Sequence, residues 1–544
     1  MDSLDGTVTK SWVLVLAVAA LAIFSFITNS TTVSQGNDPP IPKAGPYRVL
    51  PRAVLSLLYS VNAVKLLQSA YEKVLYHPRR NTQGKDLLIR KLQFKKSAFL
   101  VIRNDGEITV LPQSLLEELA AIPVSVANPQ AALERDLLGH FTGVDLILEN
   151  RLHHWIVQRR LTPKLPLLTP RMEKAVTESF DKLFPKGDEW VEFQPYQIIG
   201  RVSARVAADA MVGPAFCTNE AWLDIAFNYT ENLFRTIVVL RTVPNWMQRF
   251  LAPLLPSYWH GQKYLKSAKN LLGPKISQLM EQNDLGLWEP KDDNADDANL
   301  MSWLSSMTKG KDRDPDTISH VLVLVALASV HTTLLRMVNV LYDVTAAGSA
   351  LRDELQEEIM AAVDDGWSAQ SYDRLQKLDS VLRESQRMSP PTMLGLKRLF
   401  QKSHTFSDGT HVKAGSYVCM PIHAIENDPQ HTPNPQEFDG LRSFRARAEQ
   451  ENSANIDKAA IKEFLFSTPT KTILGFGYGR TACPGRFFAS NVIKMVLVKM
   501  FTDYEFKFLP GTQRPPNMIV HEFLFTWPWQ KMLVRRKSEA SSPF

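Results

Sequence analysis

The stretch of sequence that decides the fold reads GFGYGRTACPG and occupies residues 475–485. It follows a predicted short strand, Lys471–Leu474, and precedes an apolar helical pattern that runs from Arg486 to about Thr502. The glycines let the backbone turn tightly around the sulfur of Cys483 and aim N–H groups at it. Because the helix that follows presents its positive end to this cysteine, the pattern favours a thiolate. The segment therefore predicts a strand, a tight loop and a helix, with Cys483 as a candidate reactive group.

The loop has three interpretations. The spacing Gly477-x-Gly479-x-x-Ala482, with Asp503 about twenty residues later, fits a loose dinucleotide-binding fingerprint. Only about 60 residues follow the loop, too few for a doubly wound sheet, and this disfavours a phosphate loop. The second interpretation is an inert buried cysteine beside a glycine-rich turn. The third is a metal ligand, for which a single cysteine suits an axial position of haem iron better than zinc or an iron–sulfur cluster.

The composition is that of an ordinary globular protein, with 44% hydrophobic and 22% charged residues among 544. It excludes a disordered, collagen-like or disulfide-scaffold protein. The net charge of +6 is small for this length, so we expect no nucleic-acid partner. The cysteines at 217, 419 and 483 are far apart and odd in number, which favours a reducing compartment. We assign no role to Cys217 or Cys419.

A long helix is predicted at the centre of the fold. It begins with an N-cap at Asp316 or Thr317 and ends at about Ala346. Its first half, Ile318–Val330, is apolar on nearly every side, which is typical of a buried helix.

The rest of the chain predicts a mainly α fold with a minor β portion. Amphipathic helical patterns fill most of 130–280, and short strands flank an Asn-Asp-Gly turn at 104–106. The polar residues 284–316 predict a mobile loop. No shift in composition divides the chain, so we expect one domain over 51–544.

The N-terminal segment WVLVLAVAALAIFSFI, residues 12–27, is uncharged and apolar. Residues 11–28 would form about 27 Å of helix, the thickness of a thin endoplasmic-reticulum bilayer. We expect a luminal tail (1–10), a single transmembrane anchor (11–28) and a proline-rich linker (29–50). Cations just after the anchor place the body of the protein in the cytosol. A cleavable signal peptide and a buried core helix are the alternatives.

The loop at 475–485 resembles the cysteine-ligand loop of the cytochrome P450 family, and further motifs elsewhere in the chain resemble the same family. Phe476, Gly477, Gly479, Cys483 and Gly485 match that loop at the family's spacing, and the run after the cysteine is similar to fungal biosynthetic members. The resemblance implies that Cys483 is the axial ligand of a haem iron and that the other four residues shape the cofactor site.

The resemblance also indicates residues for the haem propionates. Trp155 and Arg159 resemble the family's W-x-x-x-R motif, whose Trp and Arg contact a propionate, and Arg398 is a further candidate. Thr481 departs from the pattern, because the family often has Arg or His at that position, also on a propionate. Arg480 or another cation would have to replace it.

Glu384 and Arg387 resemble the family's E-x-x-R pair and lie on one helix face at i, i+3. The segment 438–442 resembles the family segment that donates the third member of a Glu–Arg–Arg cluster. We expect Arg442 to be that member, with Arg445 as the alternative. Such a cluster is structural, since a buried carboxylate shared by two guanidiniums is costly to break from either side.

The long helix carries ASVHTT at residues 328–333, in the place of the family's oxygen-activation motif. Thr332 aligns with the usual threonine, whose hydroxyl serves the oxygen site. His331 replaces the usual Asp or Glu, so the resemblance implies that protons pass through imidazole or water. The alternative for His331 is a core or helix-capping histidine.

Together these motifs imply a mainly α cytochrome P450 fold, with haem between the long helix and the cysteine loop. The implied function is a monooxygenase that inserts one oxygen atom from O2 into a lipophilic small molecule, such as a terpenoid or related secondary metabolite. Electrons would come from a separate NADPH–cytochrome P450 reductase on the membrane, docking near Arg480, Arg486 and Lys494. The alternatives are a reductase-independent haem-thiolate isomerase or dehydratase, and a haem-binding protein without turnover.

Overall fold

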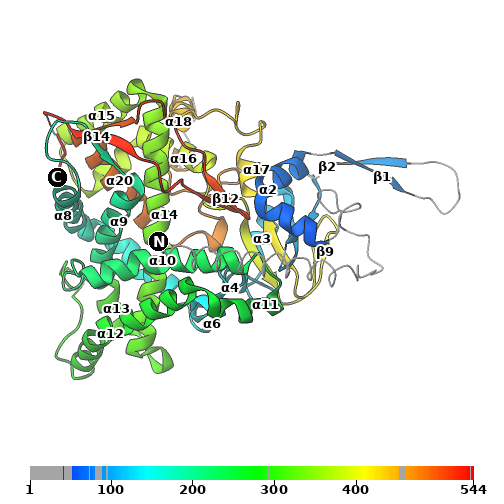
Figure 1. Ribbon diagram of the computed structural model, residues 1–544, viewed down its shortest axis with the longest axis horizontal. Coiled ribbons are helices and arrows are strands. Elements are labelled where there is room, and N and C mark those ends of the chain that lie inside the picture. The colour runs from blue at the N-terminus through cyan, green and yellow to red at the C-terminus, as the bar shows by residue number, and fades with distance from the viewer. Residues whose placement is uncertain are drawn as a thin grey trace, which may run out of the picture.

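The long helix α14 (Pro315–Ala347) runs through the helical part of the molecule (Figure 1). The computed structural model describes residue 41 and residues 52–72, 74–79, 88–93, 96–103, 105–291, 293–452, 461–539 and 541–544. Asp314 caps the helix by accepting a hydrogen bond from the backbone N–H of Thr317 at 2.8 Å. The cap therefore lies slightly before the predicted position, because Pro315 fits the first helical turn, where its missing N–H does no harm.

The helix α14 packs against α9, α10, α12, α16 and α20 and is buried along most of its length, as the apolar run predicts. Within the described part of the chain it is the one helix whose length and composition would suit a membrane span. Its packing identifies it as a core helix. The predicted anchor at 11–28 and nearly all of the linker at 29–50 lie outside the described residues.

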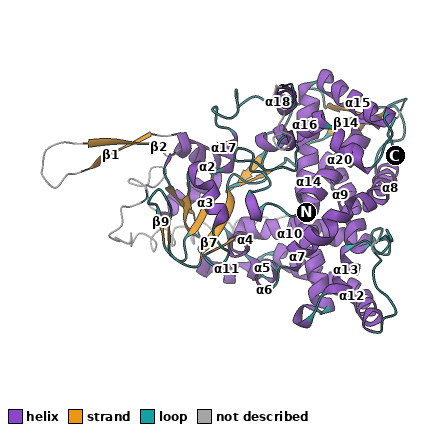
Figure 2. Ribbon diagram, turned by 180° about the vertical axis from the view of Figure 1, so that it is seen from behind, coloured by secondary structure: helices purple, strands orange, loops and turns teal. Residues whose placement is uncertain are grey.

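The mainly α fold is confirmed (Figure 2). In the described N-terminal half the helices are α2 (Arg52–Glu72), α3 (Leu116–Ala121), α4 (Pro129–Leu137), α5 (Gly139–Thr142), α6 (Leu146–Glu149), α7 (Leu152–Ile156), the π-helical turn η3 (Val157–Leu161), α8 (Leu165–Leu183), α9 (Pro195–Val212), α10 (Glu220–Leu240), α11 (Asn245–Leu251) and α12 (Pro256–Asp284). The later helices are α13 (Leu300–Met307), α14, α15 (Ser349–Asp364), α16 (Gln376–Met388), α17 (Ile422–Glu426), α18 (Arg442–Glu451), the short 3-10 helix η8 (Gly479–Thr481) and α20 (Arg486–Asp503).

The minor β portion gathers at the other end of the molecule from most of the helices, apart from one small sheet that lies among them (Figure 2). The largest sheet has the order β3 (Phe99–Arg103), β4 (Gly106–Val110), β10 (Tyr417–Met420), β7 (Gly395–Phe400), β5 (Ala127–Asn128). The β3–β4 hairpin turns at the predicted position, and β10 joins β4 in parallel and β7 in antiparallel. The other sheets are β11 (Tyr504–Phe508), β14 (Met532–Arg536) and β6 (Val191–Phe193); β1 (Val74–Arg79) and β2 (Leu88–Gln93); β8 (His404–Thr405) and β9 (His411–Val412); and β12 (Met518–Val520) and β13 (Phe523–Phe525).

Two local predictions are wrong. The polar segment 284–316 contains the helix α13, which Asn299 caps by accepting the backbone N–H of Ser302 at 2.9 Å. The apolar face of α13 is buried, so tertiary packing overrides the polar composition around it. Residues 471–474 form no strand, because the backbone N–H of Leu474 donates to the carboxylate of Glu426 at 2.5 Å instead of to a neighbouring strand.

A buried ionic cluster, which the sequence did not predict, joins the end of α10 to the largest sheet. Glu522, in the β12–β13 turn, contacts Arg241 at 2.9 Å and Arg103 at 3.0 Å, and Arg103 also contacts Asp136 of α4 at 3.1 Å. Although burial raises it, the pKa of Glu522 is held well below its usual range by Arg241 and Arg103. Removing one member would leave an uncompensated buried charge, so the cluster fixes how α10 meets the sheet.

Candidate active site

The loop at 475–485 is closed by its own backbone. The N–H of Cys483 donates to the carbonyl of Phe476 at 2.8 Å, and the N–H of Gly477 donates to the carbonyl of Leu474 at 2.7 Å. Gly477 and Gly479 adopt φ values of 78° and 63°, a region that strains residues with a Cβ. The loop thus holds Cys483 in an accessible position immediately before α20.

Two opposing effects act on the pKa of the Cys483 thiol. Desolvation by the surrounding protein raises the pKa of Cys483, and the backbone N–H of Gly485 and the guanidinium of Arg486 offset only part of this rise. These groups at the start of α20 thus act on the thiol against a larger effect of desolvation. A bound metal ion would add to their effect, because coordination deprotonates a thiol.

Two elements that are distant in the sequence, α16 and η3, contact the two ends of the loop and leave the thiol uncovered. A Cβ on Gly475 would lie 2.4 Å from the side-chain nitrogen of Gln386, so α16 is in close contact with the start of the loop. At the other end, a Cβ on Gly485 would lie 3.8 Å from Val157 of η3. The turn η3 also carries Arg159, which is exposed.

Trp155, one turn before Arg159 on α7, is 38% exposed. The structure therefore brings the W-x-x-x-R segment beside the cysteine loop, with both predicted side chains accessible.

The central helix has an interruption in its buried surface. Ala328 and Thr332 are exposed in the middle of α14, although the neighbouring positions Val330 and Thr333 are buried. The two exposed residues lie one turn apart on the same face, and the hydroxyl of Thr332 donates to the carbonyl of Ala328 at 2.7 Å. Small side chains thus border an open space beside a helix that is buried along most of its length.

His331 does not share this face with Thr332. Its Nε2 lies 2.9 Å from the carbonyl oxygen of Phe227, and its Nδ1 lies 3.4 Å from the hydroxyl of Tyr196. A carbonyl only accepts, so Nε2 carries the hydrogen and Nδ1 accepts from Tyr196. Burial lowers the pKa of His331 to about 4. The imidazole is therefore neutral and is directed toward α9 and α10, because consecutive helix residues are rotated by about 100°.

Arg398, on β7, is a buried cation with neutral partners. Its Nη2 donates to the hydroxyl of Thr481 at 2.7 Å, and its Nη1 donates to the carbonyl of Lys397 at 2.9 Å. Burial lowers its pKa to about 10. Arg480, the first candidate to replace the missing cation, is exposed and donates to the carbonyl of Ala121. The structure thus brings Arg398, and not Arg480, to the side chain of Thr481.

Glu384, Arg387 and Arg442 lie together. Arg387 contacts Glu384 through two nitrogens, at 2.7 and 3.0 Å, and Arg442 reaches the same carboxylate at 3.3 Å. Arg445, the alternative third member, pairs instead with Asp439 at the surface. The cluster joins α16 to α18 on the same helix that contacts the cysteine loop.

The position of Lys494 contradicts the prediction that it belongs to a docking face for the reductase. It lies on α20 and is buried, with its ammonium 2.9 Å from the carboxylate of Asp379 and 2.7 Å from the carbonyl of Tyr372. A cation held inside the protein by these two partners cannot meet another protein. Of the predicted docking cations, Arg480 and Arg486 retain accessible surface.

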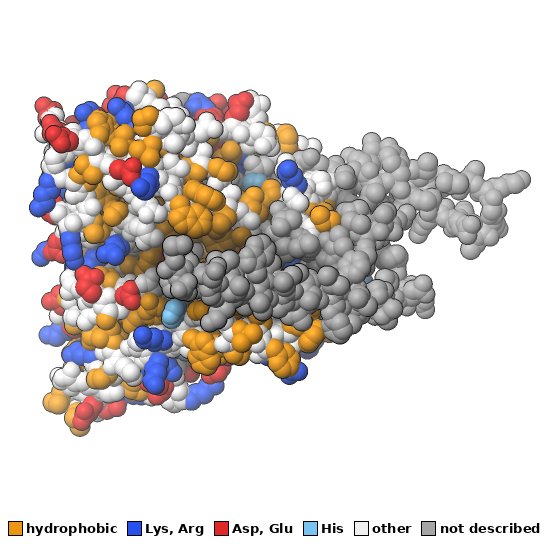
Figure 3. Space-filling view, in the orientation of Figure 1, with side chains coloured by type: hydrophobic (Ala, Val, Ile, Leu, Met, Phe, Trp, Pro, Cys, Tyr) orange, Lys and Arg blue, Asp and Glu red, His pale blue; other side chains and the backbone are white. Residues whose placement is uncertain are grey.

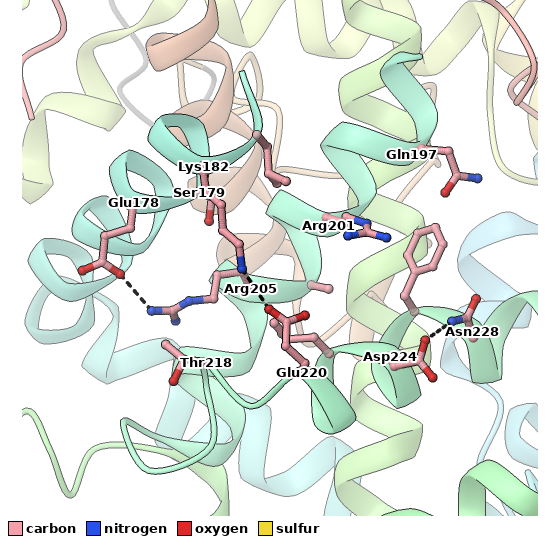
Figure 4. Close-up of a pocket in the computed structure, with 14 residues that line it drawn as sticks. Glu178, Ser179, Lys182, Gln197, Arg201, Arg205, Thr218, Glu220, Asp224 and Asn228 are labelled. Atoms are coloured by element: carbon pink, nitrogen blue, oxygen red, sulfur yellow. Dashed lines mark hydrogen bonds and ion pairs between the residues drawn. The ribbon is translucent and has the colours of Figure 1, made fainter. Parts of the chain in front are cut away.

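One pocket among the described residues is separate from the cysteine loop. It has a volume of about 310 Å³ and lies between α8, α9 and α10. Figure 4 shows that it is polar, with ion pairs between Lys182 and Glu220 and between Arg205 and Glu178. Its wall includes Phe227, whose ring stacks on His331 with centroids 4.9 Å apart. The pocket therefore lies behind α14, away from the face of Thr332.

Comparison with known proteins assigns the chain to a family. The cytochrome P450 family model matches residues 122–534. The chain belongs to the cytochrome P450 family. It is 34% identical to the cytochrome P450 monooxygenase AN1598 of Emericella nidulans over 82% of each chain. It is 33% identical to the ent-kaurene oxidase P450-4 of Gibberella fujikuroi, over 82% of this chain and 86% of the relative.

A solved structure shows the same fold. The cyanobacterial P450 CYP120A1 with bound retinoic acid superposes with a TM-score of 0.57 at 18% identity, over 81% of this chain and 92% of that chain. This likeness concerns the fold, whereas membership of the family and the similarity to cytochrome P450 monooxygenases make this P450 a haem-thiolate oxidoreductase. When bound, the haem supplies dioxygen activation, and the thiolate favours O–O cleavage.

The residues present fit a haem. Cys483 is free and accessible, whereas the other cysteines, Cys217 and Cys419, are buried, and burial raises the pKa of Cys419 to about 12. Arg398 offers a buried positive charge to a carboxylate. The gap at Ala328 and Thr332 leaves room beside α14.

Replacing Arg442 with alanine tests the ion cluster of this P450. The loss of one guanidinium from the buried carboxylate of Glu384 should lower the free energy of unfolding by about 1–3 kcal/mol and reduce the haem retained after purification. Urea denaturation and the haem-to-protein ratio measure both effects. The matched control is Arg445→Ala, on the same helix, which should change stability by less than about 0.5 kcal/mol. Equal losses in the two variants would contradict the assignment of Arg442.

Proposed function

We propose that this P450 inserts one oxygen atom from O2 into a lipophilic terpenoid or related secondary metabolite, with electrons from a separate NADPH–cytochrome P450 reductase. The observation that carries the proposal is the accessible Cys483, held by the glycine loop at the start of α20. The relative named as an ent-kaurene oxidase supports a terpenoid substrate. Aromatic rings of α10 and β13 gather where Phe234 contacts Phe523 and Phe525, and such an apolar cluster supports a lipophilic substrate.

In this proposal Cys483 is the axial haem ligand, and the loop residues give the backbone its shape around the sulfur. The remaining loop residues of the site are Phe476, Gly477, Gly479 and Gly485. The propionates are held by the residues beside the loop, which are Trp155, Arg159 and Arg398. The cluster of Glu384, Arg387 and Arg442 is structural and supports the loop through α16.

Thr332 is proposed as the hydroxyl that serves the oxygen site. Its Oγ1 rests on the carbonyl of Ala328 and is exposed to the open space, so it can turn and offer its proton there. His331 lies on a different face of α14 from Thr332, and its Nε2–H donates to the carbonyl of Phe227 on α10. A direct transfer of a proton from His331 is disfavoured, because burial keeps the imidazole neutral and its nitrogens face α9 and α10.

Membrane association is part of the proposal. We infer a single-pass anchor at 11–28 in the endoplasmic reticulum, with the catalytic domain in the cytosol. A patch of large apolar side chains on α11 and the segments that follow it supports contact with the bilayer: Trp246, Phe250, Leu254 and Trp259 are 50–69% exposed. Apolar side chains also interrupt the charged surface in Figure 3. Tryptophan favours the membrane interface, because its ring is apolar and its N–H is polar.

The thiolate assignment is tested by the carbon monoxide difference spectrum of the reduced protein. Wild type should show the red-shifted Soret band of thiolate-bound haem, and Cys483→Ala should lose it, because no other accessible cysteine exists in the chain. Cys217→Ala is the control and should keep the band. A band that survives in Cys483→Ala would overturn the proposed function.

Replacing Thr332 with alanine tests the proton role and the need for a reductase. In a reconstituted system with NADPH and reductase, the ratio of hydroxylated product to NADPH consumed should fall at least about tenfold in the alanine variant, because the hydroxyl that positions a proton is missing. Thr332→Ser should recover most of this ratio.

Product formation by wild type without NADPH or reductase would favour the isomerase or dehydratase alternative instead.

The membrane patch is tested by fluorescence quenching in liposomes with brominated acyl chains. The double variant Trp246→Phe, Trp259→Phe should lose a quenched component that wild type shows, because both rings are expected in the bilayer interface. Trp303→Phe, which replaces a buried ring of α13, is the control and should leave that component unchanged. Unchanged quenching in the double variant would place the patch away from lipid.

A further inference from the structure

Three buried arginines of this P450 have their pKa lowered to about 10 by desolvation, and Arg398 differs from the other two. Arg336 lies in the field of Asp343, and Arg383 lies in the field of Asp379, so each has a carboxylate in its surroundings. Within the described residues, no carboxylate offsets the desolvation of Arg398, which is 3% exposed. A buried charge without a counter-ion is costly, and this cost indicates an anion that binds there.

The contact between Arg398 and Thr481 has a fixed polarity. A guanidinium only donates, so the oxygen of Thr481 accepts from Nη2 at 2.7 Å. The threonine hydrogen is then free to point to the carbonyl of Tyr478, 3.4 Å away in the same loop. The carbonyl of Lys397 holds Nη1 at 2.9 Å. Two neutral acceptors thus orient the guanidinium and leave its other N–H groups available.

We propose that Thr481 is a positioning residue that holds the guanidinium of Arg398 at the cysteine loop, where it pairs with a haem propionate. The inference rests on the proposed haem site and deepens it. The chain lacks the usual cation two residues before the cysteine, and the structure brings a cation to that position from β7 instead. The charge therefore comes from the sheet, and the loop supplies only a hydroxyl to orient it.

The proposal separates two kinds of effect at position 481. If Thr481 merely packs in the loop, its loss should loosen any porphyrin equally. If it orients a charge on a propionate, its loss should matter only when the propionate carries a negative charge. Haemin and haemin dimethyl ester share the iron and the ring but differ in that charge.

The experiment reconstitutes full-length protein with haemin or with its dimethyl ester and measures the rate of porphyrin loss to excess apomyoglobin by absorbance. With haemin, Thr481→Val should lose the porphyrin about tenfold faster than wild type, because a charge-assisted contact to the propionate is misaligned. Thr481→Ser should restore the wild-type rate. With the dimethyl ester, Thr481→Val and wild type should lose the porphyrin at the same rate.

Arg398→Gln completes the test. It should show the same dependence on the free propionate, and Thr481→Val in the Arg398→Gln background should add nothing, because the hydroxyl acts through the guanidinium. An equal penalty for Thr481→Val with both porphyrins, or an additive penalty in the double variant, would overturn the proposal. If Thr481→Val fails to fold, as judged by circular dichroism, Thr481→Ala takes its place beside the serine variant. Wild type that binds haemin without the thiolate spectrum would instead refute the proposed function and not this contact.

Discussion

A cysteine that ligates a metal inside a folded protein must be held in place from several sides and yet stay uncovered. In this P450 the backbone bond from Cys483 to Phe476 and the left-handed conformations of Gly477 and Gly479 make the loop tight. Outside the loop, α16 contacts Gly475 and η3 contacts Gly485. Because Gly475 has no Cβ, α16 approaches the loop closely while the sulfur remains accessible.

The same constraint explains the Glu384 cluster. The carboxylate is buried, and two guanidiniums and the backbone N–H of Asp439 surround it. Its members join α16 to the segment that leads into α18, so the helix that contacts the loop cannot shift without exposing or orphaning a charge. The loop geometry therefore depends on interactions well away from the sulfur.

The sequence predicted elements whose signals are local. The apolar run of α14, the glycine spacing of the loop and the i, i+3 pair on α16 each lie within a few turns of chain, and the structure contains all three elements. The ionic cluster of Arg103 and Glu522 joins residues 419 positions apart, and no local pattern could indicate that pairing. The burial of Lys494 escapes local patterns for the same reason, since its partner Asp379 comes from another helix. Helix α13 was missed because buried packing, and not composition, stabilises it.

The adjacent residues His331 and Thr332 show that matching a sequence motif does not by itself assign a role to each of its residues. A helix turns by about 100° per residue, so neighbours in sequence meet different surroundings. The hydroxyl of Thr332 faces open space, whereas the imidazole of His331 lies between α9 and α10 with both nitrogens in contact. An acid at that position would bring a negative charge to the carbonyl of Phe227, which repels it, while a neutral imidazole donates to it. The histidine is thus suited to hold two helices together, and of these two neighbours only the threonine presents a polar group to the open face of α14.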